Sequence, residues 1–400
     1  MTGALDRTTQ DAAIEVAKLG DIAAGAGLHR VSMLAWRDLD DPEAGGSELH
    51  ASNIAKHWAE AGIEVNIRTS YAAGHSQVTW RDGYRVIRKA GRYLVFPRAA
   101  FSEMMGWHGG RDGLVEIWNG MPFFSPLWSR TAHVTWLHHV HAEMWQMTLP
   151  PRLAALGNFV ESKVAPPIYH RTSMVTPSES SKREMVHDLG FRPDRVSVVP
   201  PGIDPHYQAG GEKSPTPLVV AVGRLVPVKQ FDVLIDALLP LKADHPDLEA
   251  VIIGEGYTRE ELESQIHAAR AESWIHLLGR VDETTKVEYY QRAWVLASAS
   301  AREGWGMTIT EAAACGTPSV VSDIAGHADA VVDGETGILC RGRDALTVGL
   351  DRLLRDGDLR ARMSGAARVR AAFFSWEATA RGTLEILAAA AISRRRRRHR

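Results

Sequence analysis

Apolar segments of strand length alternate with segments of helical periodicity along nearly the whole chain. This alternation is typical of parallel β-sheets that are covered by helices on both faces. It occurs in two runs, separated by the stiff, turn-forming segment from Pro200 to Pro205 and by a Pro/Gly-rich stretch over residues 210–217. The sequence therefore predicts an α/β protein with two Rossmann-like halves.

The apolar pattern also predicts the individual elements. In the first run we expect strands over residues 30–36, 64–68, 84–88, 93–96, 114–118, 133–137, 173–176 and 196–199, and a helix over 48–61. In the second run we expect strands over 218–222, 249–253, 275–278 and 295–297, and helices over 231–241 and 259–271. The predicted parts of the chain are an N-terminal extension (1–28), a first domain (29–200), a second domain (201–375), an amphipathic helix (376–392) and a basic tail (393–400).

The charge of the chain is unevenly distributed. The formal net charge of −2 includes six arginines between Arg394 and Arg400, so the rest of the chain carries −8. An acidic body argues against binding to nucleic acid, because affinity for the phosphate backbone depends on a basic surface. With 45% apolar and 24% charged residues, the chain has the composition of a globular protein rather than of a disordered one.

The two cysteines, Cys315 and Cys340, form no disulfide framework and no metal-binding spacing, which favours a reducing compartment. No stretch reaches 18 apolar residues. Several acidic residues lie within the first 28 positions, where a signal peptide needs positive charge and an apolar core. We therefore expect a cytoplasmic protein without a membrane span.

The densest chemical signal is the glycine-flanked turn from Arg302 to Gly306, which opens a helix at about Met307. A helix N-terminus presents unpaired amides and positive partial charge, so this turn predicts a diphosphate site. Glu303 precedes the helix and Glu311 lies in it, and both can bind hydroxyl groups of one ligand. The alternative is that Glu303 is a surface loop residue and Glu311 a solvated helical one.

A second signal follows the first strand of the second run. Arg224 and Lys229 lie five residues apart on this loop, where the carboxyl ends of parallel strands meet the ligand crevice. Their charges can neutralise a diphosphate. Alternatively, Arg224 only pairs with an acid of the same domain. The nearby Gly254-Glu255-Gly256 lacks the third glycine of a dinucleotide fingerprint.

Weaker signals lie in the first run. Gly45 and Gly46 open a helix after the first strand, an anion-binding geometry. The cluster His138-His139-Val140-His141 suggests a metal, but a contact from His138 to a sugar hydroxyl is the favoured interpretation, and no metal site is predicted. Asp38-Leu39-Asp40 is interpreted as a solvated or acceptor-side loop.

Tryptophans and basic residues concentrate in the first run. Three interpretations stay open: a lipid-facing surface, a platform that stacks on sugars, or core aromatics beside a solvated hairpin. Together with the arginine tail, the first of these predicts contact with an anionic membrane, at the inner face of the membrane. The residues concerned are Trp107, Trp118, Trp128, Trp136 and Trp145, with Arg81, Arg85, Arg88, Lys89, Arg92 and Arg98.

In combination, these motifs resemble glycosyltransferase family 4, retaining enzymes of the GT-B fold. The stretch from Glu303 to Glu311 is similar to that family's EGFG-x4-E signature, with Trp305 in place of the usual Phe, and Gly223-Arg224-Leu225 with Lys229 is similar to its diphosphate clamp. The resemblance spans nearly the whole chain. It implies two Rossmann-like domains that face each other across a cleft, and a final helix over 376–392 that crosses back to complete the first domain.

The resemblance also implies roles for the matching residues. Lys229 and Arg224 would hold the pyrophosphate, Glu311 the ribose hydroxyls and Glu303 the hydroxyls of the transferred sugar. The other implied contacts are Gly306, Met307 and Thr308 at the pyrophosphate, Gly45 and Gly46 at the donor phosphate, His138 beside the donor sugar, and Arg280 and Val281 at the nucleobase.

The implied reaction moves a hexosyl group, with retention, from a nucleoside-diphosphate sugar to a hydroxyl of a carbohydrate or lipid-linked acceptor, without a further cofactor. The departing diphosphate would take the acceptor's proton, so no side-chain nucleophile is needed. The chain departs from the family where Asp329 replaces a common glutamate and where Pro201 replaces a common asparagine. A nucleotide-sugar epimerase of the same architecture and a catalytically idle nucleotide-sugar binding protein are the alternatives.

Overall fold

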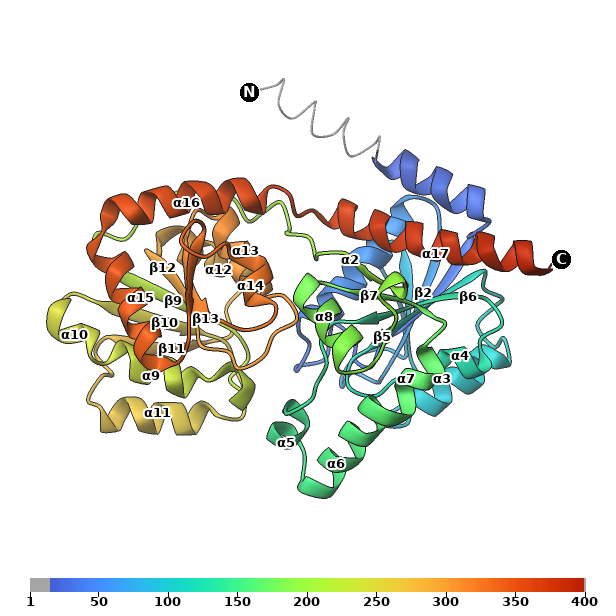
Figure 1. Ribbon diagram of the computed structural model, residues 1–400, viewed down its shortest axis with the longest axis horizontal. Coiled ribbons are helices and arrows are strands. Elements are labelled where there is room, and N and C mark those ends of the chain that lie inside the picture. Colours follow the sequence, from blue (N-terminus) through green and yellow to red (C-terminus); the bar gives the residue numbers. More distant parts are fainter. Residues whose placement is uncertain (1–14, 399–400) are drawn as a thin grey trace. The chain divides into compact units, whose positions relative to one another are not determined.

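The computed structural model describes residues 15–398. This part of the chain separates into two compact units: unit 1 contains residues 15–145, 150–202 and 376–398, and unit 2 contains residues 146–149 and 203–375. Each unit has its own sheet of mainly parallel strands with helices on both faces (Figure 1). The predicted α/β class with two Rossmann-like domains is confirmed.

The sheet of unit 1 has eight strands in the order β3-β4-β2-β1-β5-β6-β7-β8. All neighbouring strands are parallel except β3 and β4, which form an antiparallel hairpin at one edge. The strands are β1 (Arg30–Leu34), β2 (Glu64–Thr69), β3 (Val78–Arg81), β4 (Tyr84–Arg88), β5 (Gly113–Trp118), β6 (Ala132–Leu137), β7 (Ser173–Thr176) and β8 (Val196–Val198).

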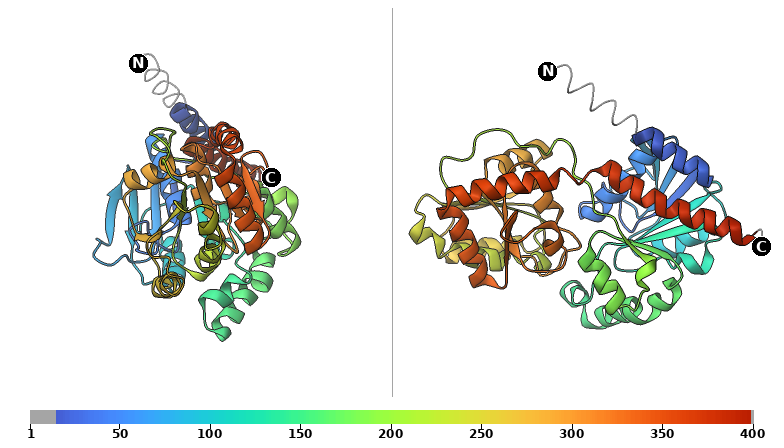
Figure 2. Two further views of the ribbon diagram at one scale, coloured as in Figure 1. Left: turned by 90° about the vertical axis from the view of Figure 1, so that its left-hand side faces the viewer. Right: turned by 45° about the horizontal axis from the view of Figure 1, so that its top comes forward.

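One face of this sheet packs on α2, α17 and a helix through residues 15–26, which share a core around the buried Trp58 and Trp136. Trp58 Nε1 donates a hydrogen bond to the Ala380 carbonyl of α17 (3.0 Å), so the final helix packs on the first domain, as expected (Figure 2). The helices are α2 (Gly46–Glu60), α3 (Val95–Met104), α4 (Ser125–Trp128), α5 (Met144–Thr148), α6 (Pro151–Phe159), α7 (Ala165–Tyr169), α8 (Glu179–His187) and α17 (Trp376–Arg398), with a π-helical segment over Val160–Val164.

One local prediction in unit 1 was wrong, and one strand was not predicted. The segment 93–96 is no strand, because α3 begins at Val95. Pro97 is tolerated in the first turn of a helix, where its missing N–H costs nothing, and the helix formers after it extend that turn. The strand β3 was not expected, although Asp82-Gly83, both with positive φ, is a strong hairpin-turn signal.

The sheet of unit 2 has six parallel strands in the order β11-β10-β9-β12-β13-β14. The helix predicted over 231–241 ends at Leu238, just before Pro240. The strands are β9 (Leu218–Val222), β10 (Glu249–Ile253), β11 (Ile275–Gly279), β12 (Val295–Ser298), β13 (Ser319–Ser322) and β14 (Gly337–Cys340). The helices are α9 (Phe231–Leu238), α10 (Leu241–Asp244), α11 (Arg259–Ala268), α12 (Glu283–Arg292), α13 (Met307–Ala314), α14 (His327–Ala330), α15 (Arg343–Arg355) and α16 (Gly357–Ala371).

None of the helices within residues 15–398 is both long enough and apolar enough to cross a membrane.

Candidate active site

Two loops meet at the carboxyl edge of the sheet in unit 2. Because β9 and β12 are neighbouring parallel strands, the chain segments that follow them emerge side by side. The first loop ends in a 3₁₀ turn, Pro227–Lys229, and the second carries Glu303. The Ala301 amide donates to the Val228 carbonyl (2.8 Å), and Lys229 Nζ forms an ion pair with Glu303 Oε1. Two predicted site residues, 74 positions apart in sequence, are therefore in contact.

Glu303 lies in a partly open, polar environment. Its side chain is 19% exposed, and Ser300 Oγ donates to its Oε1 at 3.0 Å. Burial opposes its ionisation, but the Lys229 ammonium, His327 and the Ser300 hydroxyl outweigh that effect and hold its pKa below the usual range. The site therefore holds a carboxylate and an ammonium that are both charged and both accessible to a polar ligand.

The start of α13 follows Glu303 by three residues. Gly306 caps this helix with φ at +101°, a conformation that side chains other than glycine's rarely adopt, and a Cβ there would lie 2.8 Å from Ile309 Cδ1. The predicted helix start at Met307 is confirmed. The amides of Met307 and Thr308 belong to the first turn, which has no intrahelical acceptor for them, so this end of α13 can bind an anion.

Glu311 lies about one turn further along α13 and is only 5% exposed, so it is not a solvated helical residue. Its Oε2 accepts a hydrogen bond from Tyr290 Oη (3.0 Å) and lies 3.7 Å from Lys286 Nζ. Burial raises the pKa of Glu311, and Lys286 and Tyr290 oppose this shift. The carboxylate is held in one place by groups from α12.

The remaining predicted donor residues come from neighbouring loops of unit 2. Arg224 lies two residues after the end of β9, and Arg280 and Val281 follow the edge strand β11. Val281 and Met307 both pack against the same apolar cluster of unit 2.

The glycines after β10 have a structural role that the sequence left unexplained. The Gly223 amide donates to the Ile253 carbonyl (3.0 Å), and the Leu225 amide donates to the Glu255 carbonyl (2.9 Å). A Cβ on Gly254 would lie 1.8 Å from the Gly223 carbonyl oxygen, so only glycine permits this approach. Gly254 thereby holds the loop that carries Arg224.

In unit 1, the predicted glycine turn caps α2. The Gly45 amide donates to Glu48 Oε2 (2.9 Å) in a capping box, which leaves Gly46 as the first helical residue. Ser47 Oγ also donates to Glu48 Oε2 and accepts a hydrogen bond from Asn119, which follows β5. The turn is therefore fixed at the carboxyl edge of the sheet.

His138 follows β6 at the same edge. Its ring stacks on Trp136 with centroids 5.4 Å apart and meets the ring of His50 from α2 at 4.8 Å. Both ring nitrogens of His138 are buried and have no hydrogen-bond partner within residues 15–398. Burial lowers the pKa of His138 to about 4, so the ring is neutral and can still donate one hydrogen bond and accept another.

The neighbouring histidines are engaged differently. The ring of His141 stacks on His139, and Glu161 accepts hydrogen bonds from the amides of His141 and Ala142 and from Trp145 Nε1. In the described part of the chain, no group of three or more His, Cys, Asp or Glu side chains is arranged to hold a metal ion.

The interpretation of Asp38 as solvated was wrong. Its side chain is 3% exposed and forms ion pairs with Arg88 and with Arg81 (3.0 Å) from the β3–β4 hairpin. Burial opposes its ionisation, but the two guanidinium groups keep its pKa below the usual range. Asp40 pairs with the same two arginines. This segment is therefore clamped by a hairpin of the same sheet.

The chain is similar to known glycosyltransferases along most of its length. The family model "Glycosyl transferases group 1" matches residues 204–370, and the model "Glycosyltransferase Family 4" matches residues 44–207. A D-inositol 3-phosphate glycosyltransferase of Corynebacterium glutamicum is 32% identical over 399 residues, which cover 88% of this chain and 94% of the relative. The chain belongs to the family 4 glycosyltransferases.

Solved structures agree with the GT-B fold of this glycosyltransferase. Sucrose-phosphate synthase from Thermosynechococcus elongatus superposes with a TM-score of 0.76 at 18% identity, covering 89% of this chain and 97% of that one. Anabaena HepE in complex with UDP and glucose superposes with a TM-score of 0.71 at 19% identity, covering 90% and 100%.

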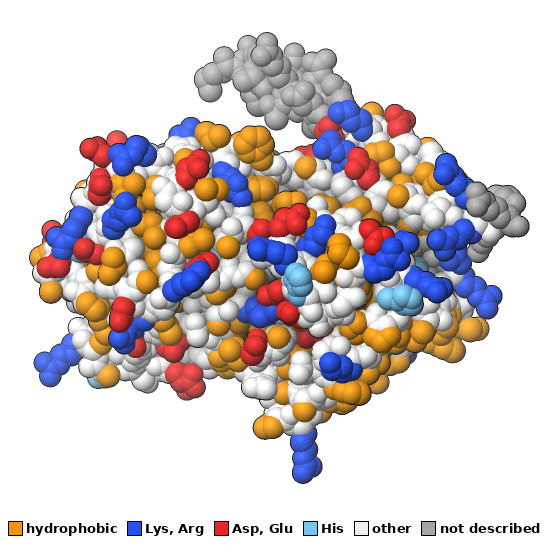
Figure 3. Space-filling model, viewed as in Figure 1, with side chains coloured by type: hydrophobic (Ala, Val, Ile, Leu, Met, Phe, Trp, Pro, Cys, Tyr) orange, Lys and Arg blue, Asp and Glu red, His pale blue; other side chains and the backbone are white. Residues whose placement is uncertain are grey.

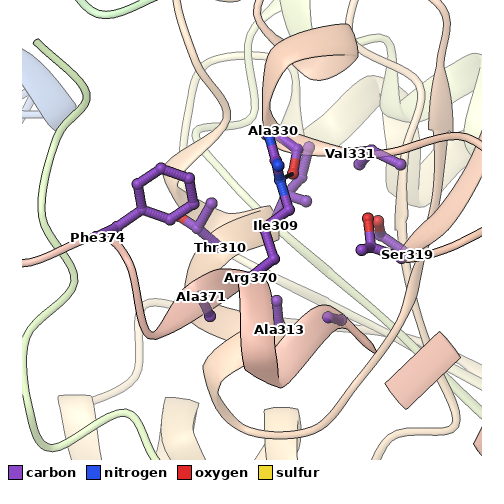
Figure 4. Close-up of a pocket in the computed structure, with 11 residues that line it drawn as sticks. Ile309, Thr310, Ala313, Ser319, Ala330, Val331, Arg370, Ala371 and Phe374 are labelled. Carbon is purple, nitrogen blue, oxygen red and sulfur yellow. Dashed lines mark hydrogen bonds between the residues drawn. The ribbon is translucent and has the colours of Figure 1, made fainter. Parts of the chain in front are cut away.

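A small pocket of the glycosyltransferase lies on the other side of α13, between that helix, α14 and α16 (Figure 4). It is lined mainly by small apolar side chains and by Arg370, which donates hydrogen bonds to the Asp329 and Ala330 carbonyls. The lining includes none of the predicted site residues. We therefore assign this pocket to packing rather than to the site.

Several residues around the candidate site were not predicted from the sequence. Ser300 and His327 surround Glu303, Lys286 and Tyr290 surround Glu311, and His50 supports His138. A signal existed for His327, because it follows the strand β13 and a glycine with positive φ at the same carboxyl edge. Ser300 lies only three residues before Glu303 on the same loop, whereas the contacts of Lys286, Tyr290 and His50 join separate elements.

Proposed function

We propose that this glycosyltransferase moves a hexosyl group, with retention at the anomeric carbon, from a uridine diphosphate sugar to a hydroxyl of a carbohydrate or glycolipid acceptor. The observation that carries the proposal is the Lys229–Glu303 pair beside the glycine-capped start of α13. A cation and a helix N-terminus suit a diphosphate, and an adjacent carboxylate suits sugar hydroxyls.

In the proposed reaction, negative charge develops on the diphosphate as its bond to the anomeric carbon breaks. Lys229, Arg224 and the first amides of α13 stabilise that charge, and fixed groups of this kind usually supply the largest part of catalysis. The acceptor oxygen bonds to the anomeric carbon on the face that the diphosphate leaves, and the acceptor proton passes to a diphosphate oxygen. Glu311 binds the ribose hydroxyls, and the Arg280–Val281 backbone binds the base.

One side chain in each unit is proposed to bind sugar hydroxyls. In unit 2, Glu303 accepts hydrogen bonds from these hydroxyls, which in the free protein are replaced by those of Lys229 and Ser300. In unit 1, His138 donates a hydrogen bond from its neutral ring. Its two unpartnered nitrogens support this role, because a buried polar group without a partner is destabilising unless a ligand satisfies it.

The relatives guide the choice of substrates. Several solved neighbours hold UDP, and relatives are D-inositol 3-phosphate glycosyltransferases. Uridine diphosphate sugars are therefore the first donors to test, and inositol 3-phosphate is the first acceptor. A thermal-shift screen against nucleoside diphosphates identifies the base, because a ligand at 100 times its dissociation constant adds about 2.7 kcal/mol to stability.

The deciding experiment measures UDP release from each sugar donor with and without acceptors, and determines the anomeric configuration of the product by NMR. Acceptor-dependent release with a retained configuration is the expected result. An inverted product would refute the retaining mechanism. Conversion of the donor to its epimer without an acceptor would identify an epimerase, and binding without turnover would identify an idle binding protein.

A further inference from the structure

One outer face of unit 1 combines exposed apolar side chains with unpaired cations. The helix α3 buries Val95, Ala99, Ser102 and Glu103. Its opposite face, with the segments on either side of the helix, exposes large apolar side chains to at least half of their area. These side chains are Tyr93, Leu94, Phe101, Met104, Met105 and Trp107.

Their spacing makes this a continuous stripe. Leu94, Phe101 and Met105 recur at helical intervals, and Arg98 lies between them on the same face. The rings of Phe101 and Trp107 meet edge to face, with centroids 5.5 Å apart. Apolar side chains gather over the lower right of the face in Figure 3, where Figure 1 places α3, α4 and α7, with Lys and Arg side chains among them.

Three cations border the stripe without partners. Arg81, Arg88 and Arg92 of this basic stretch pair with acidic residues, whereas Arg85, Lys89 and Arg98 have no ion pair or side-chain hydrogen bond within residues 15–398. We call the six apolar side chains and these three cations the α3 surface.

The imidazole of His108, which follows Trp107 in the chain, is affected by the charges of these cations. Burial, together with the charges of Arg68, Lys89, Arg85 and Arg98, lowers the pKa of His108 to about 4. The cations therefore gather around one point at the end of the apolar stripe, rather than being spread over the unit.

The α3 surface runs from the carboxyl edge of the sheet, where Lys89, Tyr93 and Leu94 follow β4, to the amino edge. The loop after α3 leads into the amino end of β5, where the Asp112 carboxylate accepts hydrogen bonds from the amides of His29 and Arg30. At the same edge, Leu387 of α17 packs against Leu28 and Gly113, so the arginine-rich end of α17 arrives there too. Gly45 and His138 lie at the other, carboxyl edge.

We propose that the α3 surface docks this glycosyltransferase onto an anionic lipid bilayer. Aromatic and methionine side chains beside arginine and lysine are the composition of interfacial helices, whose apolar face enters the headgroup region while the cations meet lipid phosphates. The unpaired charges select an anionic surface, which polybasic segments attract. The proposal does not depend on the proposed reaction.

The test is co-sedimentation of the full chain with vesicles of phosphatidylglycerol and phosphatidylcholine, and with vesicles of phosphatidylcholine alone. We expect binding to the anionic vesicles only, and loss of this binding at high salt, which screens surface charges. Arg85→Gln/Lys89→Gln/Arg98→Gln should weaken binding about 100-fold, at about 1 kcal/mol per charge. Phe101→Ser/Trp107→Ser should weaken it by at least about 10-fold.

Matched controls come from exposed residues of unit 2. The variants Arg352→Gln/Arg362→Gln/Arg368→Gln and Phe373→Ser should bind anionic vesicles like the unaltered chain. All variants should keep the thermal unfolding midpoint of the parent, which shows that they are folded independently of any vesicle.

Several outcomes would overturn the proposal. Absence of binding to anionic vesicles at low salt is the first. If substituting Arg394 to Arg397 by Gln abolishes binding while the α3 variants bind normally, the tail and not the α3 surface is the docking element. A dimer that Trp107→Ser disrupts without vesicles would identify a second copy as the occupant. A thermal shift by inorganic phosphate that only the triple variant loses, without vesicle binding, would identify a soluble phosphate ligand.

Discussion

The two units have the same kind of sheet but use charge in opposite ways. Unit 2 places the Lys229–Glu303 pair at its carboxyl edge, where both side chains are about one-fifth exposed. Unit 1 buries the charge cluster that follows β1, in which Asp38 is 3% exposed and Arg88 is 1% exposed, and the His138 ring at the same edge of its sheet is neutral. Partly open charges can exchange their partner for a ligand, whereas fully buried charges serve the fold.

The largest expected effect comes from substitutions in the charged pair of unit 2. Lys229→Ala and Glu303→Ala should each lower kcat by about 10²–10³, because the first removes a charge that stabilises the departing diphosphate and the second removes the carboxylate that orients the transferred sugar. The measurement is UDP release at saturating acceptor. Glu263→Ala, which removes an exposed partner of Arg259 on α11, is the matched control and should leave kcat unchanged. Normal turnover in both site variants would refute the assignment.

The next effect tests unit 1. Asp38→Asn should lower the free energy of unfolding by about 3 kcal/mol, because it leaves two guanidinium groups without their main buried partner. Urea unfolding measures the loss. Asp194→Asn, at the exposed pair of Asp194 and Arg192, should leave the urea midpoint unchanged. If the two variants are equally stable, burial does not distinguish the ion pairs.

The free energy of unfolding, measured as a function of pH, tests the neutral His138 ring of unit 1. Its folded pKa of about 4 lies below the ordinary 6.5, so the unfolded chain gains a proton first as the pH falls. The neutral ring therefore contributes fully above about pH 7, and its contribution is lost between 6.5 and 4. Going from pH 7 to pH 5, the free energy of unfolding of the parent should fall relative to His138→Phe by about 2 kcal/mol. Val134→Ala, a buried change without a titrating group, should cost the same at both pH values.

The smallest effect concerns the start of α13. Gly306→Ala should lower the free energy of unfolding by about 1 kcal/mol, because alanine is strained at a φ of +101°. Gly365→Ala is the matched control with the opposite sign: it lies inside α16, and no atom lies within 4 Å of the added Cβ. There alanine should raise stability by up to about 1 kcal/mol. Thermal unfolding of both variants, with and without UDP, measures these opposite changes in stability.

Much of the fold was predictable because each strand has its own apolar pattern. The strands β4, β7, β9 and β10 begin and end at the expected residues. The error at 93–96 arose because Val95 and Phe96 favour a strand locally, whereas the residues after Pro97 continue a helix. Local preference does not decide between the two when the outcome depends on a longer segment.

The site was predictable in its residues but not in its contacts. The sequence indicated Lys229 and Glu303 separately, yet their pairing requires that β9 and β12 be neighbours, which depends on strand order. The same holds for Asp38, whose partner Arg88 is 50 positions away. Such contacts follow from topology, and a pattern read along one strand contains no information on its distant neighbours.

The β3–β4 hairpin has a consequence for protein engineering. Arg81 and Arg88 form ion pairs with Asp38 in the loop that runs from β1 to the glycine turn of α2. Arg37 of the same loop pairs with Glu48, which caps the turn. Exchanging the hairpin with that of a relative would therefore alter the glycine turn unless Asp38 and Asp40 were exchanged with it. In a chimera, the hairpin and the loop should therefore be exchanged together. In directed evolution of the glycine turn, the residues of the hairpin should be varied along with those of the turn.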